Sequence, residues 1–297
     1  MTQQISLPEE YYNKYDIYKE KYGKIALLTQ SGSFYNMYSP LDFSRGNAAE
    51  LAKVKYIELT KKKAGYYMPG FPTYRLEDKF LKILLDNDYT VIIEDQFENT
   101  TDPLNNRMAR VVTRVVSKGT YESTNLRNNI MSIYIYQYSK NYVSFGISVI
   151  DTNLSDTINV HEIHSLPNDY NIALDTAIKL VLQYNPVECI IVTKNESKLP
   201  DIIKHLPLNC PIYRRDIQVA QNFTDEDENE NENDDYSEYI MYSLNVLKSF
   251  LRDHFINVSN LKIVNSNTFK DSMDLCSNSV KQLDLFLFYE RKDINLT

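Results

Sequence analysis

Cysteine is scarce in this chain of 297 residues, which holds only Cys189, Cys210 and Cys276. Their odd number and wide spacing argue against a disulfide framework, and there is no CxxC pair of the kind that begins a metal knuckle. No apolar run approaches the roughly 18 residues that a membrane-spanning helix needs. The N-terminus also lacks the basic start and apolar segment of a signal peptide. We therefore expect a soluble, intracellular protein.

Tryptophan is absent and only seven glycines occur, whereas tyrosine is abundant, with 24 residues. We interpret this as compositional bias, so the tyrosine count by itself does not indicate binding chemistry. Hydrophobic residues make up 43% of the chain and aromatic residues 12%, which is enough to form real cores. At about 150 residues per domain, the length predicts two domains and excludes a wholly disordered chain.

The net charge of -8 would at first exclude a polyanionic partner, but the charge is unevenly distributed. Residues 1–125 hold 17 Lys and Arg against 16 Asp and Glu, and are close to neutral. Eight acids and three Asn gather in residues 225–235, with no apolar residue among them. This segment predicts a disordered loop. It could alternatively mimic DNA or bind a basic partner.

The first 125 residues alternate between helical and extended patterns. Tyr11, Tyr15, Tyr18 and Tyr22 recur at steps of three and four residues, which predicts a buried helical stripe ending near Gly23. Further patterns predict helices at 48–53 and 76–84, and strands at 25–30, 56–60, 90–94 and 110–116. We expect a mixed α/β domain over residues 1–125.

The second half predicts another sheet. Residues 130–138 and 142–151 should pair as a hairpin, since apolar and small residues alternate through the latter. A strand at 157–163, a helix at 172–184, a buried parallel strand at 188–192 and a helix at 239–255 follow. Three antiparallel strands, a helix and a central parallel strand are the order of a ribonuclease-H-like sheet. We place this domain at 126–260 and the start of a truncated third domain at 261–297, where Val280, Leu283 and Leu287 form a helical pattern.

Four stretches between residues 24 and 120 occur in a linked order: KIALLTQSGSFYNMY, YIELTKKK, YYMPGFPTYRLEDKFLKILLDNDYTVIIEDQ and RVVTRVVSKGT. Together they resemble the N-terminal mismatch-recognition domain of the MutS DNA mismatch-repair family. The sequence of this N-terminal block is most similar to MutS-like proteins of large DNA viruses and octocoral mitochondria. Residues 130–258 resemble the family's ribonuclease-H-like connector domain, and MDLCSNSVKQLDLF at 273–286 resembles the start of its core lever domain.

The resemblance implies that the function is binding and not covalent catalysis, namely DNA mismatch recognition in DNA repair. In the family, the Phe of a Phe-x-Glu motif wedges beside the mispaired base from the minor groove, while the Glu hydrogen-bonds the displaced base. Phe34 matches the Phe, whereas Asn36 stands at the Glu position and carries no charge. A mismatch lowers the cost of opening the stack, so a wedge detects an error without reading sequence. The alternative for Phe34 is a core aromatic that follows a strand.

Seven basic residues are candidates for contacts with DNA phosphates, the alternative being an ordinary solvated face. They are Lys61, Lys62, Lys63, Arg45, Arg107, Arg110 and Arg114. The segment from Met68 to Pro72 matches a family loop that approaches DNA near the wedge, although its Pro and Gly would also suit a rigid turn. The implied partner is double-stranded DNA with mismatches.

The family's ATPase domain lies beyond residue 297, and no GxxxxGK[ST] motif is present. We therefore expect a non-catalytic chain without a cofactor, because ATP and Mg²⁺ would bind the missing domain. The remaining MutS-like domains would lie on a longer or a separate chain. The viral factory, the nucleus and the mitochondrion all remain open as compartments.

Two other functions remain open. One is binding of branched DNA or recombination intermediates, favoured if Asn36 abolishes mispair discrimination. The other is a ribonuclease-H-like nuclease, which needs carboxylates on central strands to hold metal ions. The strand MSIYIYQY carries no acid, which leaves only Asp151 and Asp175. His161 and His164 should project to opposite faces of a strand, as surface residues rather than metal ligands.

Overall fold

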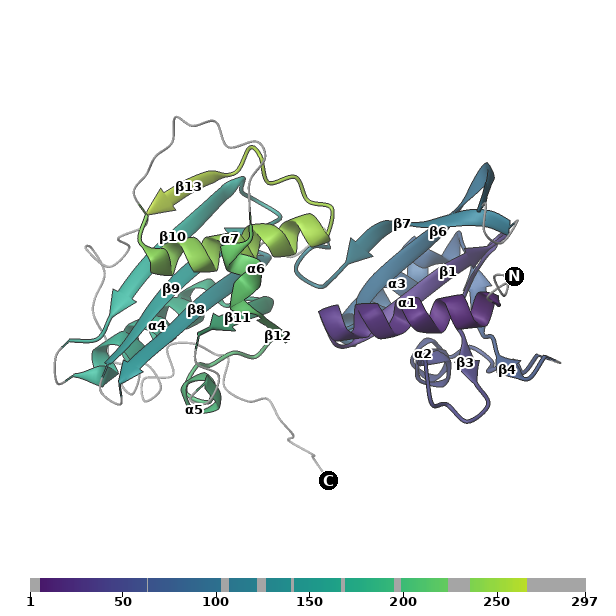
Figure 1. The fold of residues 1–297 in the computed structure, drawn as a ribbon, viewed down its shortest axis with the longest axis horizontal. Helices are drawn as coiled ribbons and strands as arrows, with labels where there is room; N and C mark the ends of the chain where they lie inside the picture. Colours follow the sequence, from purple (N-terminus) through teal and green to yellow (C-terminus); the bar gives the residue numbers. More distant parts are fainter. Residues whose placement is uncertain are drawn as a thin grey trace, which may run out of the picture. The chain divides into compact units, whose positions relative to one another are not determined.

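The computed structural model describes residues 6–62, 64–102, 107–121, 127–139, 142–166, 169–194, 199–223 and 236–265. The chain divides into two compact units (Figure 1). The first comprises residues 1–121 with 252–256, and the second comprises residues 122–251 with 257–297. The acidic segment 225–235, Cys276 and the helical pattern at Val280, Leu283 and Leu287 lie outside the described residues.

The first unit is built on a mixed five-stranded sheet in the order β5-β2-β1-β6-β7. Its strands are β1 (Ile25–Ser31), β2 (Phe34–Asn36), β5 (Gly70–Pro72), β6 (Thr90–Asp102) and β7 (Arg107–Val116). β1 and β6 run parallel, and the other neighbours are antiparallel. A separate antiparallel pair joins β3 (Ser39–Pro40) to β4 (Tyr66–Tyr67). The predicted mixed α/β class is confirmed.

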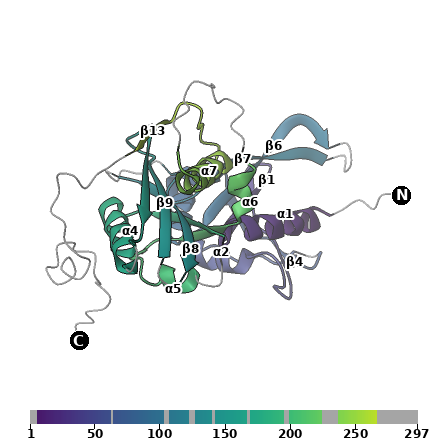
Figure 2. The same ribbon diagram turned by 60° about the vertical axis from the view of Figure 1, so that its left-hand side comes forward.

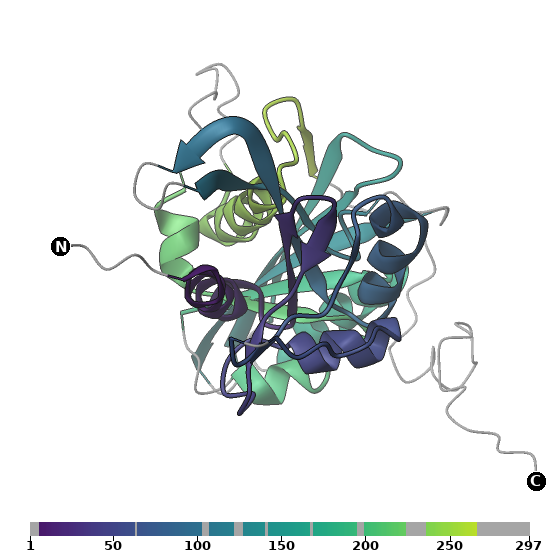
Figure 3. The same ribbon diagram turned by 90° about the vertical axis from the view of Figure 1, so that its right-hand side faces the viewer.

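Helices cover both faces of this sheet. α1 (Leu7–Tyr22) lies on one face, and α2 (Ala48–Lys55) and α3 (Leu81–Asp86) lie on the other (Figure 3). A π-helical turn, η1 (Leu76–Phe80), leads into α3. α1 ends at Gly23, whose φ of +75° is a conformation that glycine adopts at helix ends. Three of the four tyrosines of the predicted stripe, Tyr11, Tyr15 and Tyr22, are buried on the inner face of α1, and Tyr18 is half-buried against the same core.

The second unit is a six-stranded sheet in the order β12-β11-β8-β9-β10-β13. Its strands are β8 (Asn129–Ser139), β9 (Tyr142–Asp151), β10 (Thr157–His164), β11 (Glu188–Thr193), β12 (Ile212–Arg215) and β13 (Lys262–Asn265). β8, β9 and β10 form an antiparallel meander, and β11 lies parallel to β8. The order of three antiparallel strands, a helix and a parallel strand is as predicted, with β12 and β13 added at the edges.

Two long helices cover opposite faces of the second sheet (Figures 1 and 2). They are α4 (Tyr170–Tyr184) and α7 (Glu238–Asp253), and the short helices α5 (Leu199–Ile203) and α6 (Ile217–Gln221) complete the unit. α7 lies against small residues of β9, where the hydroxyl oxygens of Ser148 and Ser243 are 2.7 Å apart. A Cβ added to Gly146 would stand 1.8 Å from the carbonyl oxygen of Tyr239. The close approach of α7 therefore requires glycine at position 146.

Gly146→Ala is expected to lower the free energy of unfolding by about 1–3 kcal/mol, because its methyl group overpacks the contact with the α7 backbone. Urea denaturation measures the loss. Ser148→Ala is the matched control, since it removes a hydrogen bond from the same strand without adding volume, and should cost about 1 kcal/mol. A Gly146→Ala loss no larger than that of the control would mean that α7 shifts freely.

Three sequence-based predictions are wrong. Residues 56–60 form no strand, because Tyr56 ends α2 in the left-handed region with φ of 55° and turns the chain away. Residues 262–265, assigned above to a third domain, instead pair with the open edge of β10 as β13. His161 and His164 do take opposite faces, but His161 is buried, with Nε2 2.9 Å from the hydroxyl of Tyr184. Within the described ranges, no helix is long and apolar enough to cross a membrane.

Candidate nucleic-acid interface

A tight hairpin connects β1 to β2. Ser31 pairs with Phe34, so Gly32 and Ser33 alone form the loop. Gly32 has a φ of +60° at the first loop position, where a type II′ turn takes glycine. Phe34 is therefore the first residue after the turn, and its position depends on how rigidly the turn is held.

Hydrogen bonds hold this turn on both sides. The backbone N–H of Gly32 donates to Oε1 of Gln96 at 2.7 Å, and Nε2 of Gln30 donates to the carbonyl of Gly32 at 3.0 Å. Oε1 of Gln30 in turn accepts from the backbone N–H of Gln96 at 2.7 Å. On the other side, the N–H of Thr73 donates to the carbonyl of Ser33 at 2.9 Å. The turn is thus tied to both β6 and the segment after β5.

Gly32→Ala is expected to destabilise the protein by about 1–2 kcal/mol, because an L-residue is strained at positive φ. An added Cβ would meet no atom within 4 Å, so the loss is conformational and not steric. Gly32→Asn is the control, since asparagine tolerates this region better than alanine does. Thermal unfolding should order the proteins as wild type, then Asn, then Ala. Equal unfolding temperatures for Asn and Ala would contradict this reasoning.

Phe34 is 46% exposed at the start of β2, opposite Ser31 on one side and Pro72 on the other. It is therefore not a core aromatic. The next residue anchors the strand, because Tyr35 is buried and its hydroxyl donates to Oδ1 of Asp95 at 2.6 Å. The pKa of Tyr35 is raised, mainly because the residue is buried and secondly because of this hydrogen bond to Asp95. The strand thus presents one exposed aromatic ring beside a fixed one.

Asn36 is buried and pairs across the sheet with Gly70. A Cβ on Gly70 would lie 2.4 Å from Oδ1 of Asn36, so the two residues are in tight contact. The N–H of Met37 also donates to the carbonyl of Pro69 at 3.0 Å. Met68 is half-buried and packs against the first core. The segment from Met68 to Gly70 therefore packs beside the side chain of Asn36.

Arg110 lies on β7, at the end of the sheet where β1 ends. It pairs with Gln96, and its Nε donates to the carbonyl of Gln30 at 2.9 Å. A guanidinium carries five N–H donors, so a phosphate can be bound alongside these contacts. From β2 to β7 are three strand spacings of about 4.8 Å each, or roughly 14 Å between Phe34 and Arg110. Phe97 and Met108, each 46% exposed, extend the same end of the sheet.

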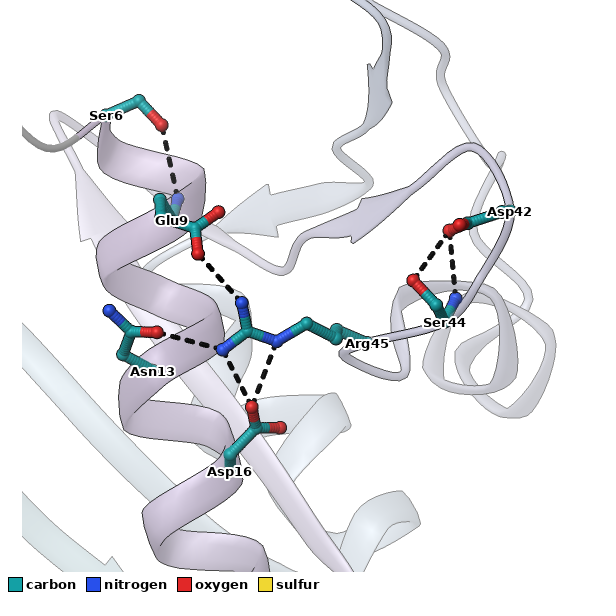
Figure 4. A network of polar contacts seen from close by, with 7 residues as sticks. All are labelled: Ser6, Glu9, Asn13, Asp16, Asp42, Ser44 and Arg45. Atoms are coloured by element: carbon teal, nitrogen blue, oxygen red, sulfur yellow. Dashed lines mark hydrogen bonds and ion pairs between the residues drawn. The ribbon is translucent and has the colours of Figure 1, made fainter.

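Arg45 has a different role from the one predicted. Its guanidinium donates to Oε1 of Glu9 at 2.8 Å, Oδ1 of Asn13 at 2.9 Å and Oδ2 of Asp16 at 2.7 Å, as Figure 4 shows. The pKa of Arg45 is raised, chiefly by the hydrogen bond to Asp16. Arg45 thus ties the loop before α2 to α1. The sequence does not reveal this because the acids lie 29 and 36 residues away.

The other predicted phosphate ligands are dispersed. Lys61 is exposed and pairs with Tyr67 through an isolated antiparallel bridge, and Lys62 follows it into a turn. Arg114 forms an ion pair with Glu77. Lys63 and the side chain of Arg107 lie outside the described parts of the structure. Phe34, Asn36 and Arg110 therefore share one sheet, while Lys61 and Lys62 lie in the turn leading to β4.

A chain of polar contacts in the second unit has the order of a nucleophilic triad. Oγ of Ser144 is 2.8 Å from Nδ1 of His164, whose Nε2 is 2.8 Å from Oε1 of Glu162. Ser144 is 0% exposed, so no substrate can reach its hydroxyl. Asp151 accepts backbone N–H groups from Asn128 and Asn153. Among the residues that the structure describes, no three His, Cys, Asp or Glu gather as a metal site.

Known proteins resemble this chain over both units. The family described as MutS domain I matches residues 10–125. A DNA mismatch repair protein mutS homolog of Acanthamoeba polyphaga mimivirus is 26% identical over 226 residues, covering 68% of this chain and 20% of that protein. The DNA mismatch repair protein MutS of Clostridioides difficile is 25% identical over 269 residues, covering 84% of this chain and 26% of that protein. The chain thus spans about a quarter or less of the length of these relatives.

Proposed function

We propose that this chain binds duplex DNA and recognises mismatches with Phe34 as a minor-groove wedge, and its match to the family described as MutS domain I over residues 10–125 supports this proposal. The observation that carries the proposal is the exposed ring of Phe34 on a two-residue hairpin. Opening a base step costs a few kcal/mol, and a mismatch reduces that cost. A ring held rigidly before binding loses little entropy when it inserts.

Positively charged residues would supply the sequence-independent part of the affinity. Arg110 lies roughly 14 Å across the sheet from Phe34, by strand spacing, and is placed to meet a backbone that flanks the groove. Lys61 and Lys62 add two further cations. The proposed interface holds few positive charges, so binding by this chain alone should be weak and steeply dependent on salt.

Titration of four DNAs at one salt concentration tests the proposed function. The four are a homoduplex, the same duplex with a G·T pair, a duplex with an unpaired loop and a four-way junction. We expect the G·T and looped duplexes to bind more tightly than the homoduplex. Tightest binding to the junction would favour the alternative, a protein for branched DNA, and equal binding to all four would overturn mismatch recognition.

The double variant Lys61→Ala/Lys62→Ala should weaken binding to the homoduplex and the G·T duplex alike. Loss of two phosphate contacts should flatten the slope of log affinity against log salt by about 1.8. Lys79→Ala/Lys82→Ala is the matched control, because it removes two exposed lysines from the η1–α3 segment and leaves the turn intact. If both double variants weaken DNA binding and flatten the salt slope equally, the loss of affinity would come from the change in net charge alone.

We further propose that this chain is non-catalytic and that ATP-dependent steps belong to MutS-like domains on a longer or separate chain. No ATP hydrolysis and no Mg²⁺-dependent cleavage of DNA are then expected from it. Cleavage that disappears in Asp151→Asn would instead favour the nuclease alternative. The mimivirus relative supports a viral factory as one of the compartments to examine.

A further inference from the structure

Another exposed aromatic ring lies on what we term the aromatic arm, formed by β3, the loop 41–46, residues 60–62 and 64–65, and β4. The rings of Phe43 and Tyr67 stack in parallel, with centroids 4.9 Å apart and planes 6° apart. Tyr67 is half-buried, whereas Phe43 is 47% exposed. The arm therefore supports one ring from below and leaves nearly half of the upper residue open to solvent.

The loop holds Phe43 in a conformation that a bulky residue rarely adopts. Its φ is 56°, in the left-handed region, and its N–H donates to the carbonyl of Pro40 at 3.1 Å. Asp42 accepts from the N–H of Ser44 at 3.0 Å and from its hydroxyl at 2.8 Å (Figure 4). Arg45 then fixes the loop to α1. Such a strained residue persists only where its surroundings impose it, and strain of this kind concentrates at binding sites.

The charges beside the ring suit a phosphate. Lys61 is the cross-strand partner of Tyr67, and partners in an antiparallel pair project to the same face. Lys62 follows it at the turn. Asp42 keeps its negative charge, because Ser44 donates only neutral hydrogen bonds to its Oδ1, so a phosphate would bind on the Lys61 side of the ring. The charge of Arg45 is offset by Glu9 and Asp16. An ammonium group therefore lies on the face of the arm that carries the stacked rings.

Resting on the proposed DNA-binding function, we propose that the aromatic arm binds an unpaired nucleotide, with its base stacked on Phe43 and its phosphate at Lys61. Aromatic rings combined with basic side chains are how proteins bind single strands without reading sequence. A base inside a duplex has both faces covered, so only an unpaired nucleotide offers a face to the ring. The arm would then favour duplexes with looped-out nucleotides over duplexes with a single mispair.

Single tryptophans test this assignment directly, because the chain has none of its own. Phe43→Trp places the fluorophore on the arm, Phe34→Trp places it on the wedge, and Tyr138→Trp places it on an exposed position of the second unit, 76% exposed, as the control. Each full-length variant is titrated with a homoduplex, a G·T duplex and a duplex carrying a loop of unpaired thymidines. Stacking of a base on the indole quenches its fluorescence.

We expect the looped duplex to quench Phe43→Trp strongly, and the homoduplex and G·T duplex to quench it little. The looped duplex should leave Tyr138→Trp unchanged. Quenching of Phe43→Trp with no quenching of Phe34→Trp would support the arm and overturn the wedge. The opposite pattern would overturn the arm and leave the wedge standing. If all three variants respond alike, neither site is specific.

Affinity gives an independent measurement. Phe43→Ala should weaken binding to the looped duplex by about tenfold, within the range for loss of one stacked base, while leaving the G·T duplex unaffected. Phe43→Tyr keeps an aromatic face and should retain binding. Circular dichroism confirms folding of each variant, since Phe43 lies outside the core. An unchanged affinity of Phe43→Ala for looped DNA would overturn the proposal.

Discussion

Lys14→Met is expected to lower the free energy of unfolding by about 3–5 kcal/mol, the cost of leaving a buried charge without its partner. Glu94 on β6 is only 2% exposed, and its Oε1 lies 2.8 Å from Nζ of Lys14 on α1. Its other oxygen accepts from the hydroxyl of Thr29 at 2.8 Å. Without Lys14, the carboxylate keeps one neutral donor and loses its charged partner. Urea denaturation at neutral pH measures the loss.

The double variant Lys14→Met/Glu94→Leu separates charge from packing. An apolar pair of similar volume is often as stable as a buried ion pair, so the double variant should recover most of the loss. The difference between the single and double variants gives the coupling energy. A double variant as unstable as Lys14→Met would show that the space beneath α1 does not accept apolar side chains.

Most of the fold could be predicted from the sequence, because its long elements carry strong periodic patterns. The tyrosine stripe buries one face of α1, and in β9 apolar residues alternate with the small residues that lie under α7, so the period of each pattern fixes helix or strand directly. The short strands β2 and β5 could not be predicted, since three residues carry no period and their pairing depends on distant partners. Tyr56 shows the opposite error, where a sequence favourable for a strand yields to the left-handed end of a helix.

The candidate site could be predicted less fully, for reasons of distance along the chain. The resemblance to the MutS family singles out Phe34 as a candidate, but the exposure of Phe34 depends on a hairpin that hydrogen bonds tie to Gln96 and Thr73. Arg45 looked like a phosphate ligand until acids on α1 were brought beside it. The stacking of Phe43 on Tyr67 could not be predicted from the sequence. The two residues are 24 positions apart, and in a chain with many aromatic residues nothing marks these two as a pair.

Asn36 shows how packing limits a substitution suggested by the resemblance. Glutamate there would restore the family's motif, but it is one methylene longer and would enter the tight contact with Gly70. It would also leave a charge in a buried position. The contact therefore ties any change at Asn36 to the position of the segment from Met68 to Gly70, and Phe34 is the better residue for testing the wedge.

Phe34→Ala is expected to remove most of the preference for a G·T duplex over the homoduplex while leaving residual affinity for both. Stacking by one aromatic ring contributes about 1–3 kcal/mol, or roughly 5- to 150-fold in affinity, and acts only where a base step can open. Fluorescence anisotropy with the two labelled duplexes at fixed salt measures both affinities. Phosphate contacts remain in the variant, so its salt dependence should match that of the wild type.

Phe97→Ala is the matched control for the wedge. Phe97 has the same exposure, 46%, and lies on β6 near the same end of the sheet, but it does not follow the two-residue turn between β1 and β2. It should lower the affinities for both duplexes by similar factors or leave them unchanged. If Phe97→Ala removed the mismatch preference as completely as Phe34→Ala, recognition would depend on a broad apolar surface. A wedge requires that the preference vanish with Phe34 alone, because only one ring can occupy the opened step.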